Sequence, residues 1–144
     1  MTDPYLSGMI SPGTDPFYKK QVVEGRLVVV LSNKFDRRDM TLIPQASRAV
    51  LRYEIHELVL TDETAAPNDT INRVFGIGFF EVTAPGLIVT GDSVHVSGRS
   101  LGTVAGFNGD HMPNHLNIVV QGSGRKTGAE MGMDLEDPIV IEKK

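Results

Sequence analysis

Short apolar runs separated by glycine, proline, asparagine and aspartate are the feature of this chain that most restricts its fold. The clearest run is RLVVVLS at residues 26–32, whose consecutive β-branched side chains predict a strand. Residues 47–52 leave two alternatives open, a helical turn or the beginning of the next strand. Further strands are predicted at 50–60, at 71–83, on both sides of the turn Thr90-Gly91-Asp92, at 99–107, at 115–120 and at 135–143.

This spacing predicts an all-β, mainly antiparallel fold with at most one or two short helical turns. A small closed or partly open β-barrel of about seven strands is favoured over a sandwich. The reason is that Gly76 and Gly78 lie inside the strand VFGIGFF, where a closing sheet has to bend or bulge. The expected organisation is an extended N-terminal arm at 1–19 and a single domain at 20–144. Within that domain we expect a mobile loop at 123–134 and a closing strand at 135–143.

The composition is that of one small globular domain: 144 residues, of which 40% are apolar and 22% charged. A net charge of −4 argues against a general nucleic-acid binder, and no stretch approaches the ~20 apolar residues of a membrane helix. The chain has no cysteine, which excludes disulfides and thiolate chemistry. The first residues lack the pattern of a signal peptide. These features predict a cytoplasmic protein with neither nucleic-acid nor membrane partners.

The most polar approach to a strand is FNGDHMPNHLNIVV at residues 107–120. His111 and His115 stand four residues apart, but Pro113 lies between them and interrupts a helix. The segment is therefore predicted to be a turn that leads into a strand. On that strand His115, Asn117 and Val119 share one face.

Three interpretations of this turn stay open. The two imidazoles can act as an acid–base pair, which makes His115 and His111 candidate catalytic residues and Asp110, Asn114 and Asn117 candidate binding residues. A metal ion bound by His111, His115 and Asp110 is an alternative. In the third interpretation, Asp110 and Asn114 only cap the turn through their own backbone bonds, and His111 is solvated.

Glutamates on apolar strand faces form the second group of candidates. Alternation places Glu57 on the face of Ile55 and Val59, where an unpaired carboxylate costs several kcal/mol. If that face lines a barrel lumen, Glu57 is a candidate general base. A strand-end glutamate paired with an arginine is the alternative. Glu81 raises the same question and is a candidate binding residue, whereas His56 is expected on a charged outer face.

The predicted function is the binding of a small organic ligand at the barrel mouth and its transformation by acid–base chemistry of the isomerase, lyase or cyclase type. No Gly-x-Ser-x-Gly nucleophile motif and no His-x-His metal motif is present, and the sequence indicates no particular cofactor. The alternative is a non-catalytic assembly module, a homo-oligomer that forms through the N-terminal arm and exposed sheet edges. The arm supplies the apolar side chains Tyr5, Leu6, Ile10, Phe17 and Tyr18 for that purpose.

Overall fold

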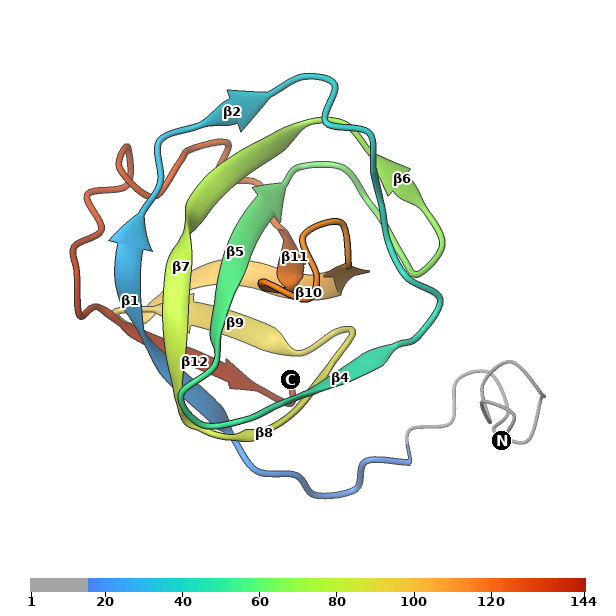
Figure 1. Ribbon diagram of the computed structural model, residues 1–144, viewed down its shortest axis with the longest axis vertical. Coiled ribbons are helices and arrows are strands. Elements are labelled where there is room, and N and C mark those ends of the chain that lie inside the picture. Colours follow the sequence, from blue (N-terminus) through green and yellow to red (C-terminus); the bar gives the residue numbers. More distant parts are fainter. Residues whose placement is uncertain (1–15) are drawn as a thin grey trace.

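The computed structural model describes residues 16–144, which form an all-β, mostly antiparallel fold (Figure 1). This confirms the predicted all-β, mainly antiparallel fold class. The described residues contain no helix, and therefore none that is long and apolar enough to cross a membrane. The first fifteen residues of the predicted arm lie outside the described part of the chain, and the division into arm and domain stays a prediction.

Seven strands form a closed ring of hydrogen-bonded neighbours in the order β1-β12-β9-β10-β11-β5-β7, and β7 pairs again with β1 (Figure 1). Every pairing in the ring is antiparallel except that of β11 with β5, which is parallel. The strands are β1 (Val23–Val30), β5 (Ile55–Thr61), β7 (Val74–Ala84), β9 (Ser93–Val96), β10 (Arg99–Asn108), β11 (Asn117–Gln121) and β12 (Pro138–Glu142).

Five shorter strands lie around this ring. The two-residue strand β2 (Lys34–Phe35) pairs with β7, β3 (Met40–Thr41) pairs with β6 (Thr70–Ile71), and β4 (Ser47–Val50) pairs with β8 (Gly86–Val89). Residues 33–45, a charged segment in which no strand is predicted from the sequence, thus carry two short strands. The alternatives at 47–52 resolve as strand for 47–50.

The single strand predicted at 50–60 is wrong, because the chain turns at 51–54 between β4 and β5. Tyr53 has a φ of 77°, which no regular strand accommodates. The Glu54 carboxylate accepts a hydrogen bond of 2.7 Å from the backbone N–H of Leu51, and the backbone N–H of Glu54 donates to the Leu51 carbonyl at 3.2 Å. The first of these bonds holds the pKa of the Glu54 carboxyl below its usual range. A side-chain cap of this kind overrides the alternating pattern.

The interior of the ring is filled by a large apolar cluster to which all seven strands contribute. On β5 its members are Leu58 and Leu60, and on β11 they are Ile118 and Val120, as period-two alternation predicts. The largest fully buried side chains are Phe80 and Phe107. Each such side chain stabilises the fold by roughly 1.5–3 kcal/mol relative to exposure. The interior is therefore a packed core.

A second apolar cluster covers the opposite, outer face of the same sheet region. Val59 of β5 and Val119 of β11 pack there beneath Met40, Leu42 and Ile71, which come from the segment of β3 and from β6. Glu57 shares this outer face, since it precedes Val59 by two residues. The face on which Glu57 lies is therefore outside the ring and does not line a lumen.

The predicted bulge at Gly76 and Gly78 is confirmed. Leu58 pairs with Gly78 but its neighbour Val59 pairs with Gly76, so that one residue of β7 is unpaired between them. A Cβ atom on Gly78 would meet the carbonyl oxygen of Val29, and one on Gly76 would meet the side chain of Asn33. Glycine at these positions lets β1 and the following segment approach β7 closely.

Candidate active site at the start of β5 and β11

A row of polar residues crosses three neighbouring strands on the outer face of the ring. Asn108 of β10 pairs in register with Asn117 of β11, and Asn117 pairs with Glu57 of β5. On the next strand, β7, the apolar residue Phe79 pairs with Glu57 and ends the polar row. Residues paired in this way project to the same side of a sheet. The sheet therefore fixes the direction of the Glu57 carboxylate.

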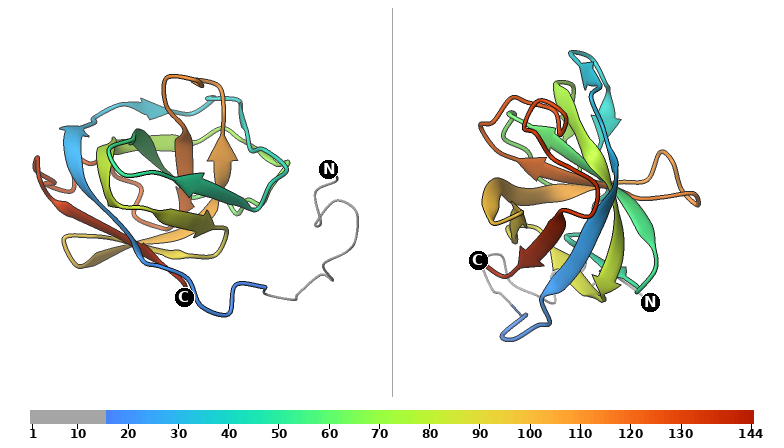
Figure 2. Two further views of the ribbon diagram at one scale, coloured as in Figure 1. Left: turned by 60° about the horizontal axis from the view of Figure 1, so that its bottom comes forward. Right: turned by 90° about the vertical axis from the view of Figure 1, so that its left-hand side faces the viewer.

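The loop between β10 and β11 carries both histidines of the polar segment. It consists of turns, in which the backbone N–H groups of Asn114 and His115 both donate to the His111 carbonyl, at 2.9 and 3.2 Å. The peptide bond between Met112 and Pro113 is cis. As predicted, the segment is a turn that leads into a strand. Figure 2 shows this loop, in orange, projecting from the body of the ring.

Glu57, His111 and His115 converge at the base of this loop. The His115 Nε2 atom lies 3.1 Å from His111 Nδ1 and 3.3 Å from Glu57 Oε1. One donor atom from each of the three residues lies within 4.8 Å of the other two. The side chains of His115 and Glu57 are only 10% and 13% exposed, whereas His111 is exposed. We call these three residues the Glu57 cluster.

His115 is held in place by the strand next to it. The backbone N–H of Leu116 donates to His56 Nδ1 at 3.0 Å, and the N–H of Glu57 donates to the Leu116 carbonyl at 3.0 Å. The ring of Phe79 meets the imidazole of His115 edge-on, with 4.8 Å between the ring centroids. His56 is buried, which corrects its expected place on a charged outer face. Its role is to fix the backbone that carries His115.

Asn114 determines which nitrogen of His115 is free. In the structure its amide nitrogen Nδ2 lies 2.9 Å from His115 Nδ1. If the amide nitrogen faces the ring, Nδ1 accepts and Nε2 carries a hydrogen that it donates to Glu57 or His111. If the amide oxygen faces the ring, Nδ1 carries the hydrogen and the Nε2 lone pair points at the cluster. A half-turn of one amide thus switches His115 from donor to acceptor.

The two asparagines of the row are locked by a chain of hydrogen bonds. Asn108 Nδ2 donates to the Thr41 carbonyl at 2.7 Å, and Asn108 Oδ1 accepts from the backbone N–H of Asp110 at 3.0 Å. Asn108 Oδ1 also accepts from Asn117 Nδ2 at 3.0 Å, which fixes the amide of Asn117. Asn117 Oδ1 is buried and has no partner among the described residues, at a cost of about 1–3 kcal/mol.

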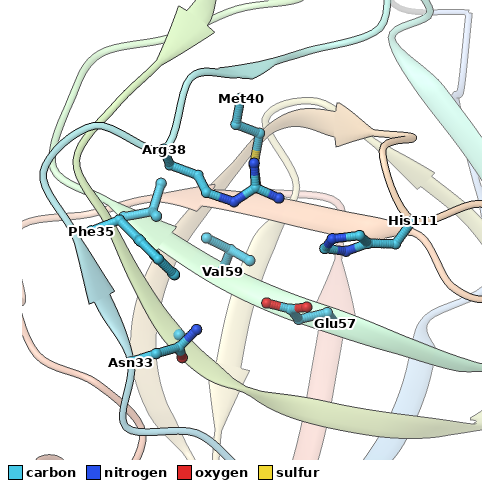
Figure 3. A pocket seen from close by; sticks show the side chains of 9 residues that line it. Asn33, Phe35, Arg38, Met40, Glu57, Val59 and His111 are labelled. Carbon is cyan, nitrogen blue, oxygen red and sulfur yellow. The ribbon is translucent and has the colours of Figure 1, made fainter.

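A pocket of about 180 Å³ opens beside the cluster. Figure 3 shows Arg38, Glu57 and His111 directed toward it from three different parts of the chain. Arg38 makes a long ion pair of 3.5 Å with the carboxylate of Asp110. The wall combines these polar groups with an aromatic ring and aliphatic side chains, and its residues are Asn33, Phe35, Arg38, Met40, Glu57, Val59, Val74, Gly76 and His111.

The predicted site residues divide into two groups in space. Glu57, His111 and His115 come together, and Asn114 and Asn117 contact the two histidines. The remaining two, Asp110 and Glu81, pair with arginines instead: Asp110 faces Arg38, and the Glu81 carboxylate accepts from Arg26 at 3.0 Å.

The pocket is completed from the segment before β4 by four residues that are not among the predicted site residues, namely Asn33, Phe35, Arg38 and Met40. The only signal in the sequence of this segment is its cluster of charges, which is equally typical of a solvated loop.

Comparison with known proteins places the chain in a family. Residues 17–142 match the family of unknown function DUF6917. The chain belongs to this family. No curated protein and no solved structure matches the chain. The DUF6917 match thus covers nearly all of the described residues, including the ring and the Glu57 cluster.

Proposed function

We propose that this DUF6917 protein binds a small organic molecule in the pocket beside the Glu57 cluster and transforms it by proton transfer. One observation carries the proposal: Glu57 and His111 both belong to the pocket wall, and His115, which is not part of the wall, contacts both of them. Apolar concave sites with a few convergent polar groups are the usual form of ligand sites.

The two halves of the pocket have different tasks in this proposal. Phe35, Met40 and Val59 bury the apolar part of the ligand, and Arg38 and Asn33 orient its polar part. The Glu57 carboxylate, in contact with His115, takes a proton from the ligand or returns it, which is the chemistry of isomerases, lyases and cyclases. We further propose that the closed ring is a small β-barrel that acts as a rigid frame, with the ligand on its outer wall.

Small oxygenated aromatic compounds provide the direct test. Phenol, benzyl alcohol, benzoate and benzamide are added to 15N-labelled protein, and at least one is expected to shift the amide signals of Phe35, Val59 and His111. His115→Ala removes the contact that positions Glu57 and His111, and it is expected to weaken the binding of that compound about tenfold. His111→Ala is expected to weaken it less, because His111 is exposed.

His95→Ala is the matched control, since His95 lies on β9 and not on the pocket wall. It should leave the affinity for the compound unchanged. The proposal fails if none of the four compounds shifts the pocket signals, or if His95→Ala and His115→Ala weaken binding equally.

One observation favours assembly as a second candidate function. Three large apolar side chains are exposed at the turn between β4 and β5. Leu51 and Tyr53 of the turn are 64% and 74% exposed, and Ile55 at the start of β5 is 45% exposed. An exposed apolar group of this size is typical of an interaction surface. We propose that it contributes to a homo-oligomer.

The mass in solution tests this second candidate. Wild-type protein is expected to show a multiple of the chain mass by light scattering, and the double variant Leu51→Ser/Ile55→Ser to show the mass of one chain. Leu135→Ser removes an equally exposed leucine, at 61%, from another surface and should keep the oligomer. A monomeric wild type would contradict the assembly function.

A further inference from the structure

We propose that Glu57, His111 and His115 together bind one divalent transition-metal ion. The inference deepens the proposed function, on whose site it rests, because it names the group that would activate the ligand there. It differs from the metal site expected from the sequence in its carboxylate, which comes from Glu57 on β5 and not from Asp110 in the loop.

The separations of the donor atoms carry the argument. Zinc lies about 2.0–2.2 Å from imidazole nitrogen and carboxylate oxygen, so two ligands of one ion stand about 3–3.5 Å apart. His115 Nε2 lies 3.1 Å from His111 Nδ1 and 3.3 Å from Glu57 Oε1, and both values fall in that range. His111 is exposed, so its side chain is free to adjust the third separation, which is within 4.8 Å.

Hydrogen bonds alone do not satisfy both contacts of His115 Nε2, with His111 Nδ1 and with Glu57 Oε1. The single Nε2 atom of His115 meets two atoms, and a neutral imidazole with hydrogen on Nε2 donates that hydrogen well to only one of them. Asn117 Nδ2 lies a further 3.4 Å from His111 Nδ1, at the edge of hydrogen-bond distance. A cation would bond to one lone pair from each of the three residues at once, and the separations of their donor atoms allow this.

The surroundings support His115 as a metal ligand. Metal-bound histidines usually donate their other ring N–H to a nearby oxygen, which fixes the ring. The amide nitrogen of Asn114 lies 2.9 Å from His115 Nδ1, and a half-turn of this exposed side chain would bring its Oδ1 there to accept the hydrogen. Leu116 and His56 hold the adjacent backbone. His115 and Glu57 are thus fixed before an ion arrives, and His111 completes the site from the solvent side.

Three protein ligands leave coordination positions open, which is the arrangement of catalytic rather than structural metal sites. The pocket lies on the side of Glu57 and His111, so a ligand in it can complete the coordination with an oxygen atom. Two imidazoles and one carboxylate suit Zn²⁺, Fe²⁺, Co²⁺ or Ni²⁺. An ion held by Glu57 would occupy the carboxylate proposed above as the base, and the hydroxide that such an ion forms from bound water at neutral pH would supply the proton acceptor instead.

Titration of the full chain with metal ions tests the inference without any organic ligand. Protein freed of metal with a chelator is titrated with Zn²⁺ and Co²⁺ by calorimetry, and visible absorption follows Co²⁺. One ion per chain is expected. Glu57→Gln and His111→Ala should each weaken Zn²⁺ binding by about a hundredfold or more, above the loss that follows removal of supporting groups. His111 is exposed, so His111→Ala should fold normally.

Asp110→Asn is the matched control for Glu57→Gln, because it also removes one carboxylate beside the pocket but not one of the cluster. Its Zn²⁺ affinity should equal that of the wild type. The inference is overturned if Zn²⁺ and Co²⁺ show no saturable binding, or if Glu57→Gln and His111→Ala bind Zn²⁺ as the wild type does.

The same preparations separate this inference from the proposed function. If the metal-free protein binds one of the four aromatic compounds but no Zn²⁺, only the metal site is wrong. If Zn²⁺ binds with the expected losses in the variants, but none of the compounds binds with or without Zn²⁺, the metal site holds and the proposed ligand function fails.

Discussion

Replacement of Gly78 by alanine is expected to lower the free energy of unfolding by about 3 kcal/mol, the upper end of the usual cost of overpacking. The added methyl group would meet the carbonyl oxygen of Val29 and come within 2.9 Å of the Leu27 side chain. Leu27 is fully buried in the interior cluster, and Val29 belongs to the strand that closes the ring. The Val29 carbonyl cannot move away without opening the pairing of β1 with β7.

Gly109→Ala adds the same methyl group where its nearest neighbour lies at 3.9 Å, and it should change stability little. Urea unfolding followed by circular dichroism compares the two variants with the wild type. Equal stability of Gly78→Ala and the wild type would refute the close approach of β1 and β7 at the bulge.

Lys20→Met is expected to cost about 3 kcal/mol, because it leaves a buried carboxylate without its partner. Lys20 Nζ lies 2.6 Å from Asp92 Oδ2, and the two side chains are only 8% and 4% exposed. The ammonium group also donates to the Leu87 carbonyl at 3.1 Å, and Asp92 accepts from the backbone N–H of Val89 at 2.9 Å. The pair therefore fastens the segment before β1 to the turn between β8 and β9.

Lys19→Met is the matched control, since the neighbouring Lys19 is exposed. A thermal melt of each variant gives the comparison. The double variant Lys20→Met/Asp92→Asn should recover part of the loss, because an asparagine amide without a charge is cheaper to bury. A melting temperature of Lys20→Met equal to that of Lys19→Met would show that the ion pair does not stabilise the fold.

Local patterns in the sequence account for much of the fold. The β-branched run at 26–32, the alternation at 115–120 and the glycines of β7 each predicted a feature that the structure has. They did not predict the turn at 51–54, where a carboxylate caps the backbone. They also gave no sign that β11 pairs in parallel with β5, because pairing between residues 60 apart leaves no trace in either segment alone.

The candidate site shows the same division. Alternation placed Glu57 with Val59 and His115 with Asn117, which brings Glu57 and His115 to one face, and His111 reaches them from the loop. It did not tell which face is the interior, because Val59 and Leu58 are both buried, one under β3 and β6 and the other inside the ring. Proximity in the sequence made Asp110, and not Glu57, the expected carboxylate beside the two histidines. What separates them is Arg38, a long-range partner.

The double pairing of β1 has a consequence for synthesis on the ribosome. β1 pairs with β7 along one edge and with β12 along the other, so the first strand of the ring in chain order needs the last one. The ring cannot close until Pro138–Glu142 have left the exit tunnel, and until then β1 and β9 each keep an unpaired edge. Such edges invite pairing with other chains. Nascent chains of this protein are thus exposed to aggregation until β12 has emerged and paired with both strands.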